Sequence, residues 1–242
     1  MQVSDLVDKH KNQLCVIYGA GPSLHFINTE PLKEYVSIAV NSGVVKAPWC
    51  DYFLSDDIGV STWSYYTELL PKLSCIKLLY EEKLKDHVNH LDNVVLFKHT
   101  WWFSPKDKKY NPDGLILTKK EPIIGAISSM GSAVHFAYLM GCDPIVLLGA
   151  DCCYKDGYRY FWDYDGEEKP HRTKPSNVKI NDKYYENFYE NRVVDYWKNL
   201  AKLNPDANII DCSDGKLTCF TKISIDKVID KYREKEMIDG QK

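Results

Sequence analysis

One short stretch near the N-terminus sets the fold class that we expect: Leu14-Cys15-Val16-Ile17-Tyr18-Gly19-Ala20-Gly21-Pro22-Ser23. Its first five residues are mostly apolar and predict a buried β-strand, which runs directly into two glycines. Glycines at such a junction let the backbone approach a phosphate, and the N–H groups at the following helix start favour negative charge. We therefore interpret Gly19, Gly21, Pro22 and Ser23 as a phosphate-binding turn. A plain tight turn is the alternative.

Outward from this stretch, apolar runs alternate with helical patterns. Strands are predicted at 36–40, 51–54, 76–79, 94–97, 144–148 and 208–210, and helices at 31–35, 60–70, 81–90, 126–140, 190–203 and 224–234. The run 144–148 is the most apolar, which places it near the sheet centre. The alternation predicts an α/β fold with a doubly wound, mostly parallel, Rossmann-like sheet in a single domain over residues 1–242.

Composition and charge exclude several classes of protein. The 242 residues are 44% hydrophobic and carry a net charge of −3. Binding to nucleic acid needs a strongly basic face, so no nucleic-acid partner is expected. Neither a signal peptide nor a membrane span is expected. The eight cysteines form no Cys-x-x-Cys pair, which indicates free thiols and a cytoplasmic protein. The oligomeric state stays open.

Two polar clusters accompany the glycine turn. Asn41 ends the second predicted strand, where an NAD site would carry Asp or Glu. Its carboxamide suits a ribose, a base or a phosphate oxygen, with a turn or capping role as the alternative. Ser129, Gly131 and Ser132 begin the predicted helix 126–140. Their hydroxyl and N–H groups predict a second anion site, whereas N-capping accounts for one serine only.

Acidic residues follow two other predicted strands. Asp151 leaves the most apolar strand, at the edge where parallel sheets bind ligands. Three roles stay open for it: binding ribose hydroxyls, holding a metal or acting as a base. A helix cap or an ion pair is the alternative. Asp56 and Asp57 follow the third predicted strand, and such a pair can hold Mg²⁺ beside a pyrophosphate, although acidic pairs are also common in loops.

The long segment 152–189 interrupts the alternation and is rich in tyrosine. Loops of this length in a compact domain usually carry function, so we interpret it as a lid. Tyrosine hydroxyls such as those of Tyr154 and Tyr160 could neutralise a leaving phosphate. His171 is the only histidine of the segment and is the candidate general base, with a solvent-exposed histidine as the alternative.

Together these motifs resemble those of a known superfamily. The blocks are the strand with Gly-x-Gly-Pro-Ser-Leu, the asparagine after the second strand, the Ser-Gly helix start and Gly-Cys-Asp-Pro-Ile-Val-Leu-Leu-Gly-Ala-Asp at 141–151. They are similar to blocks in the bacterial sialyltransferases of glycosyltransferase family 42, the motility accessory factor proteins, the archaeal 6-hydroxymethylpterin pyrophosphokinase-like proteins and short phage-encoded relatives. The resemblance covers roughly residues 14–220.

The resemblance implies roles for the site residues. The phosphate region of CMP would be cradled by Gly19, Gly21, Pro22 and Ser23, and the nucleotide would be contacted by Asn41. The same site would be lined by Ser129, Gly131 and Ser132. Asp151 would meet the ribose, and Tyr160 would help the phosphate leave. The sialyltransferases carry their catalytic histidine just before the helix that matches 190–203. Here Tyr184 or Tyr185 stands at that place, so the nucleotide site is implied more strongly than the reaction.

The function that we expect is a nucleotide-sugar-dependent, glycosyltransferase-like enzyme with a CMP-type donor, an unidentified acceptor, no certain cofactor and His171 as base. One alternative is a pyrophosphokinase-like transferase that uses ATP and Mg²⁺ held by Asp56, Asp57 or Asp151. Another is a non-catalytic protein that binds or sequesters a nucleotide. Metal dependence separates the first two, and failure to turn over a bound nucleotide favours the third.

Overall fold

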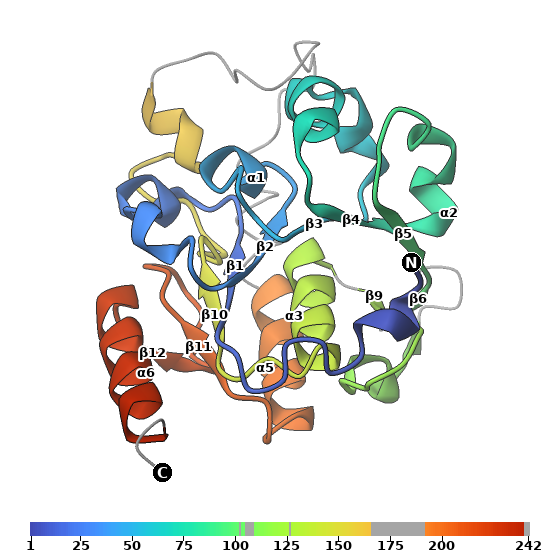
Figure 1. Ribbon diagram of the computed structural model, residues 1–242. Coiled ribbons are helices and arrows are strands. Elements are labelled where there is room, and N and C mark those ends of the chain that lie inside the picture. The colour runs from blue at the N-terminus through green and yellow to red at the C-terminus, as the bar shows by residue number, and fades with distance from the viewer. Residues whose placement is uncertain (102, 105–108, 126, 166–191, 240–242) are drawn as a thin grey trace.

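An eight-stranded sheet forms the centre of the computed structural model, which describes residues 1–101, 103–104, 109–125, 127–165 and 192–239 (Figure 1). The strand order is β12-β11-β10-β1-β2-β3-β4-β5, and every neighbouring pair is parallel. The strands are β1 (Cys15–Tyr18), β2 (Val36–Val40), β3 (Tyr52–Ser55), β4 (Ile76–Tyr80), β5 (Val94–Phe97), β10 (Ile145–Leu148), β11 (Ile209–Asp211) and β12 (Thr221–Lys222). The predicted α/β fold with a parallel, Rossmann-like sheet is confirmed.

The strand order reverses between β1 and β10. From β1 the chain adds β2 to β5 on one side, and it later returns to add β10, β11 and β12 on the other side. Both strands at the reversal are buried along their whole length, as the apolar run 144–148 predicted. Connections after β1 and β10 leave in different directions, so a crevice opens where these two strands end.

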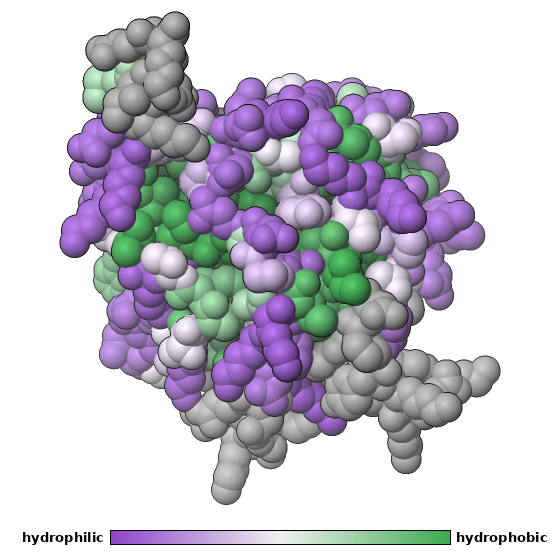
Figure 2. Space-filling view, turned by 90° about the horizontal axis from the view of Figure 1, so that it is seen from below, coloured by the Kyte–Doolittle hydropathy of each residue, from purple (hydrophilic) through white to green (hydrophobic). Residues whose placement is uncertain are grey.

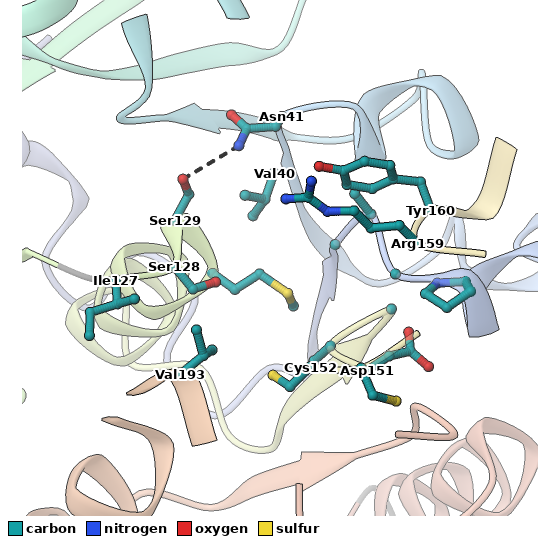
Figure 3. A pocket seen from close by; sticks show the side chains of 18 of the residues that line it. Val40, Asn41, Ile127, Ser128, Ser129, Asp151, Cys152, Arg159, Tyr160 and Val193 are labelled. Atoms are coloured by element: carbon teal, nitrogen blue, oxygen red, sulfur yellow. Dashed lines mark hydrogen bonds between the residues drawn. The ribbon is translucent and has the colours of Figure 1, made fainter. Parts of the chain in front are cut away.

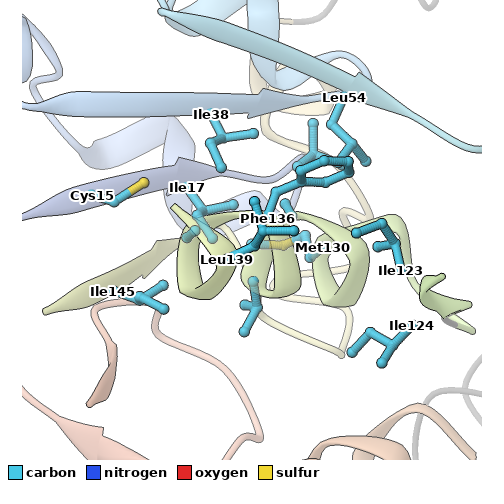
Figure 4. Packing of buried hydrophobic residues seen from close by; sticks show 14 of the residues in the cluster. Cys15, Ile17, Ile38, Leu54, Ile123, Ile124, Met130, Phe136, Leu139 and Ile145 are labelled. Carbon is cyan, nitrogen blue, oxygen red and sulfur yellow. The ribbon is translucent and has the colours of Figure 1, made fainter. Parts of the chain in front are cut away.

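Successive residues of a strand point to opposite faces of the sheet, and in the central strands the residues on both faces are apolar. Helices therefore cover both faces. On one face α3 (Ser129–Leu139) and α5 (Val194–Leu203) contribute to one hydrophobic cluster with Cys15 and Ile17 of β1. Figure 4 shows Phe136 and Leu139 of α3 beneath the strands. On the other face, α6 (Ile225–Asp239) contributes to the cluster that contains the alternate β1 residues. Close to β2, α1 (Gly43–Lys46) lies above the sheet in Figure 1.

Some predicted helices are shorter or different in kind. The predicted helix 60–70 is a 3₁₀ helix (Ile58–Thr62) followed by a π-helical turn (Tyr65–Leu69). The Asp57 carboxylate starts the first of these by accepting a hydrogen bond from Gly59 N, and Pro71 stops a longer helix. The predicted helix 81–90 is reduced to α2 (Glu81–Leu84) and a 3₁₀ turn.

Short strands occur where no strand was predicted. One parallel pair consists of β6 (His99–Trp101) and β9 (Ile123–Gly125), and one antiparallel pair consists of β7 (Phe103–Ser104) and β8 (Lys109–Tyr110). These pairs and β12 are two or three residues long, which is too short for a hydrophobic period to reveal them.

Part of the predicted lid belongs to the core. Phe161 and Trp162 are only 2% and 3% exposed, and they pack with Leu24, Val146 and Leu148. Burial of these two rings anchors the described part of the segment to the core at 161–162. The remainder of the predicted lid, 166–189, lies outside the described residues.

On the face shown in Figure 2, hydrophilic side chains lie around and between hydrophobic patches. No helix in the described part of the chain combines the length and apolarity needed to cross a membrane.

Candidate functional site

A cavity of about 300 Å³ lies where the strand order reverses (Figure 3). Ligands of doubly wound sheets bind at this position, outside the carboxyl ends of the strands. The motif blocks predicted from the sequence converge on the cavity although they are far apart along the chain. Its walls include Gly19–Pro22 after β1, Val40 and Asn41 after β2, Asp57, Ile127–Met130 at the start of α3, Gly149–Cys153 after β10, Arg159, Tyr160, Val193 and Trp197.

The glycine turn packs directly against the end of β10. Gly19 N donates to Leu148 O at 2.8 Å, and Gly21 N donates to Gly149 O at 2.9 Å. A Cβ at Gly21 would lie 2.0 Å from Asp151 Oδ2 and 2.6 Å from Gly149 O. These two N–H groups are therefore bonded within the protein, and the glycines are needed for a close approach of two strand ends. Because Gly19–Pro22 also line the cavity, the expected phosphate-binding role of this turn stays a prediction beside this packing role.

Asp151 ties the end of β10 to the 3₁₀ helix Pro22–Phe26. Its Oδ2 accepts hydrogen bonds from Ser23 Oγ at 2.8 Å and from Ser23 N at 3.3 Å. The residue is 1% exposed, and burial raises the pKa of its carboxyl to about 6, although the bonds from Ser23 act in the opposite direction. Its Oδ1 has no hydrogen-bond partner among the described residues. In Figure 3 the carboxylate of Asp151 and the side chain of Cys152 point in opposite directions.

Asn41 joins the end of β2 to the start of α3. Its backbone lies in the left-handed region at φ 50°, which asparagine tolerates better than most residues. Its Nδ2 donates to Ser129 Oγ at 3.4 Å, as the dashed line in Figure 3 marks. Cys152 on the opposite wall also has a positive φ of 52°. Strained backbone of this kind is concentrated at functional sites.

A buried carboxylate lies behind the first turn of α3. Asp56 accepts hydrogen bonds from the hydroxyls of Ser129 and Ser132, the second at 3.0 Å. Burial raises the pKa of Asp56, and the two seryl hydroxyls oppose the rise. Ser132 is fully buried and points to Asp56, so of the three predicted helix-start residues Ser129 reaches the cavity wall, while Gly131 and Ser132 lie behind it.

His99 lies close to this carboxylate, and the two would form an ion pair only with a protonated imidazole. Its Nε2 lies 3.7 Å from Asp56 Oδ2. Burial lowers the pKa of His99 to about 3, and the nearby Lys83 ammonium lowers it further. The imidazole is therefore neutral at physiological pH and stacks on the ring of Tyr80 at 4.1 Å.

The three aspartates of the magnesium alternative have different hydrogen-bond partners, although Asp57 and Asp151 both line the cavity. Asp56 faces Ser129 and Ser132, Asp57 accepts from Gly59 N, and Asp151 faces Ser23. Within the described ranges, no group of three or more His, Cys, Asp or Glu side chains could hold a metal ion.

The amino end of α3 opens toward the cavity without a side-chain cap. Ser128 occupies the N-cap position with an extended backbone, and its hydroxyl makes no capping hydrogen bond. The residue instead lines the cavity together with Ser129. The positive end of the helix dipole therefore faces the cavity without a capping hydrogen bond from the Ser128 side chain. Simple N-capping does not explain the serine cluster.

Arg159 is a site residue that the sequence did not reveal. Among the described residues that line the cavity it is the only basic one. Figure 3 shows its guanidinium directed inward beside Val40. The available signal was its place directly before Tyr160. Tyr160 lines the cavity as expected, Tyr154 is half-buried outside the described lining, and His171 lies outside the described residues.

Comparison with known proteins adds one structural neighbour. No protein-family model matches the sequence, and no curated protein matches it. The backbone is similar to that of the MAf glycosyltransferase from Magnetospirillum magneticum AMB-1, with a TM-score of 0.49 and 13% sequence identity. The match covers 92% of this chain and 37% of that chain, so this chain spans well under half of its neighbour. At that identity the likeness concerns the course of the backbone and carries no argument about activity.

Proposed function

We propose that the chain is a glycosyltransferase-like enzyme that binds a nucleotide sugar in the cavity between the ends of β1 and β10. The observation that carries the proposal is the convergence of separate motif blocks on one cavity at the reversal of strand order. Gly21, Asn41, Ser129 and Asp151 come from four different segments, and all four lie in its wall. The resemblance of these same blocks to family 42 favours a CMP-type donor.

The polar groups of the cavity suggest how such a donor would lie. The uncapped start of α3, with Ser128 and Ser129, favours an anionic group. Asn41 and Asp151 line two other parts of the cavity wall, and we place a ribose or a base between them. The phosphate would thus sit toward α3, and the sugar would extend past Tyr160.

The reaction that we propose is a direct displacement at the anomeric carbon. The acceptor hydroxyl attacks this carbon, its proton passes to a base, and the bond between the carbon and the phosphate oxygen breaks. The nucleotide then leaves with both electrons of that bond. A cavity that stabilises negative charge lowers the energy of this departure. We propose His171 as the base because it is the only histidine of the tyrosine-rich segment 152–189.

Release of nucleotide from defined donors tests the proposal. The full chain is incubated with CMP-, UDP- and GDP-sugars and with ATP, each with Mg²⁺ or EDTA, and products are separated by chromatography. Release of CMP in EDTA is the expected result. Turnover of ATP only with Mg²⁺ would favour the pyrophosphokinase alternative, and binding without turnover would favour a sequestering protein. If no nucleotide binds in calorimetry, the cavity does not serve this class of ligand.

A further inference from the structure

The backbone that carries Arg159 is held by hydrogen bonds at several points. Arg159 N and Tyr160 N both donate to Asp163 Oδ2, each at 2.9 Å. Phe161 N donates to Ala20 O at 3.2 Å, which attaches the same segment to the turn after β1. Because Phe161 is also buried in the core, the start of the Arg159 side chain is fixed relative to the cavity.

A stack of aromatic rings supports the guanidinium. The Tyr160 ring lies nearly parallel to that of Trp162, with centroids 4.4 Å apart and an interplanar angle of 13°. Trp162 is buried and meets Trp63 edge to face at 6.3 Å. On the cavity side, Arg159 Cζ lies 4.8 Å from the centroid of the Tyr160 ring. The Tyr160 ring therefore lies between a buried indole and a cation.

Guanidinium chemistry fits this arrangement. A guanidinium stacked on an aromatic ring keeps its N–H groups at the edge of its plane, where they can bind two oxygens of one phosphate. Stacking also reduces the rotamer entropy that a long side chain loses on binding. The other charged lining residues that the structure describes are the acids Asp57 and Asp151, so Arg159 supplies the positively charged side chain for an anion that the start of α3 also favours.

We propose that Arg159 binds the phosphate of the ligand, and that Tyr160 is a positioning residue whose ring, and not its hydroxyl, aims the guanidinium. The inference rests on the proposed function for the identity of the anion as a nucleotide phosphate. It extends that function by naming the cation that meets the charge, and by separating what the Tyr160 ring does for binding from what its hydroxyl does for turnover.

Calorimetry with CMP and with inorganic pyrophosphate tests both roles without requiring any turnover. The variants are Arg159→Gln, Arg159→Lys, Tyr160→Phe and Tyr160→Leu. The matched control is Lys155→Gln, which removes a cation from the same segment at a residue that pairs with Asp214 outside the cavity lining. Circular dichroism and melting temperatures establish that each variant is folded.

Loss of the guanidinium should weaken CMP binding at least about tenfold, the scale of a lost charge-assisted hydrogen bond. Lysine should restore part of the affinity because it keeps the charge but not the planar fork. Tyr160→Phe should bind within about twofold of the native protein, since it keeps the ring, and Tyr160→Leu should lose affinity as Arg159→Gln does. Affinity should also fall less steeply with added NaCl in Arg159→Gln than in the native protein.

Three results would overturn the inference. They are native affinity in a folded Arg159→Gln, equal affinity of Tyr160→Phe and Tyr160→Leu, and an equal loss in Lys155→Gln. The inference would also be overturned if the native protein bound neither CMP nor pyrophosphate. If Tyr160→Leu does not fold, the comparison of Arg159→Gln with Lys155→Gln still decides the role of the cation. Arg159-dependent binding of pyrophosphate without turnover of any nucleotide sugar would refute the proposed function while leaving this inference standing.

Discussion

Asp151 Oδ2 accepts a hydrogen bond from Ser23 Oγ at 2.8 Å, across 128 positions of the chain. This bond joins the two segments that leave the sheet on either side of the reversal in strand order. A buried carboxylate costs free energy unless it is neutral or well bonded. The packing at the floor of the cavity therefore depends on the protonation of one side chain.

Asp151→Asn should make the protein more stable than the native chain at pH 7 and equally stable at pH 4. Burial raises the pKa of Asp151 to about 6 in the folded state, above its ordinary value when unfolded, so the folded form binds the proton more tightly. Stability from this group is present at low pH and is lost as pH rises toward 6, by roughly 2–3 kcal/mol. Urea unfolding of both proteins from pH 4 to pH 8 measures the difference.

Asparagine is a suitable replacement because its amide oxygen still accepts from Ser23. Acids that do not interact with Asp151 affect both proteins equally, so the difference between the two curves reports Asp151 together with its electrostatic neighbour Asp211. Curves that stay parallel over this range would show that the Asp151 proton is bound equally in the folded and unfolded states. The same Asp151→Asn protein tests the proposed ribose contact, for which we expect nucleotide affinity to fall.

Gly21→Ala should destabilise the fold by about 1–3 kcal/mol, the usual cost of forcing an extra methyl group into packed structure. The new Cβ would lie 2.6 Å from Gly149 O, a backbone atom that cannot turn away. Gly59→Ala is the control, since the nearest atom to its Cβ is the tip of the Asp57 side chain at 3.2 Å. Thermal unfolding should show a lower melting temperature for Gly21→Ala than for the control. Equal melting temperatures would mean that the two strand ends are not packed as closely as described.

Ser132→Ala should cost about 1–3 kcal/mol because it removes one of the two hydroxyls that bond the buried Asp56 carboxylate. Ser128→Ala is the matched control on the same helix, since the Ser128 hydroxyl makes no capping bond. We expect its stability to stay within about 0.5 kcal/mol of the native value. Guanidinium unfolding at pH 7 measures both. If Ser128→Ala lost more stability than Ser132→Ala, the hydrogen bond from Ser132 to the buried Asp56 carboxylate would not be the stabilising contact.

Apolar runs made most of the sheet predictable. The predictions for β2 and β5 match the observed bounds, and those for β1 and β10 differ by one residue. These bounds are predictable because a parallel strand that is buried on both faces is a continuous apolar run in the sequence. Glycine and asparagine after β1 and β2 pointed to the correct edge of the sheet. The crevice itself could then be inferred from topology.

Other features depend on contacts that no local pattern reveals. The bond between Ser132 and Asp56 joins a helix to the end of a distant strand, and the sequence, which suggested a ligand contact for Ser132, does not reveal this bond. Phe161 and Trp162 stand in a polar segment yet pack against β1 and β10. Arg159 could not be predicted because one arginine in a charged loop has no distinctive spacing, and its contact with the Tyr160 ring becomes visible only in the structure.

Tyr160→Phe should lower the rate of nucleotide release more than it lowers nucleotide affinity. Phenylalanine keeps the ring that stacks on Trp162 and supports Arg159, so binding of the ground state is retained. The lost hydroxyl could donate to the leaving phosphate only as negative charge develops there, and an interaction made in the transition state appears in kcat and not in KM. We expect kcat to fall by about tenfold or more, the scale of one lost transition-state hydrogen bond. Steady-state kinetics with the donor identified in the release assay, together with calorimetry on the product nucleotide, separate the two effects. An unchanged kcat would confine Tyr160 to its role as a ring beneath Arg159, whereas a rise in KM with unchanged kcat would mean that the hydroxyl holds the donor before reaction.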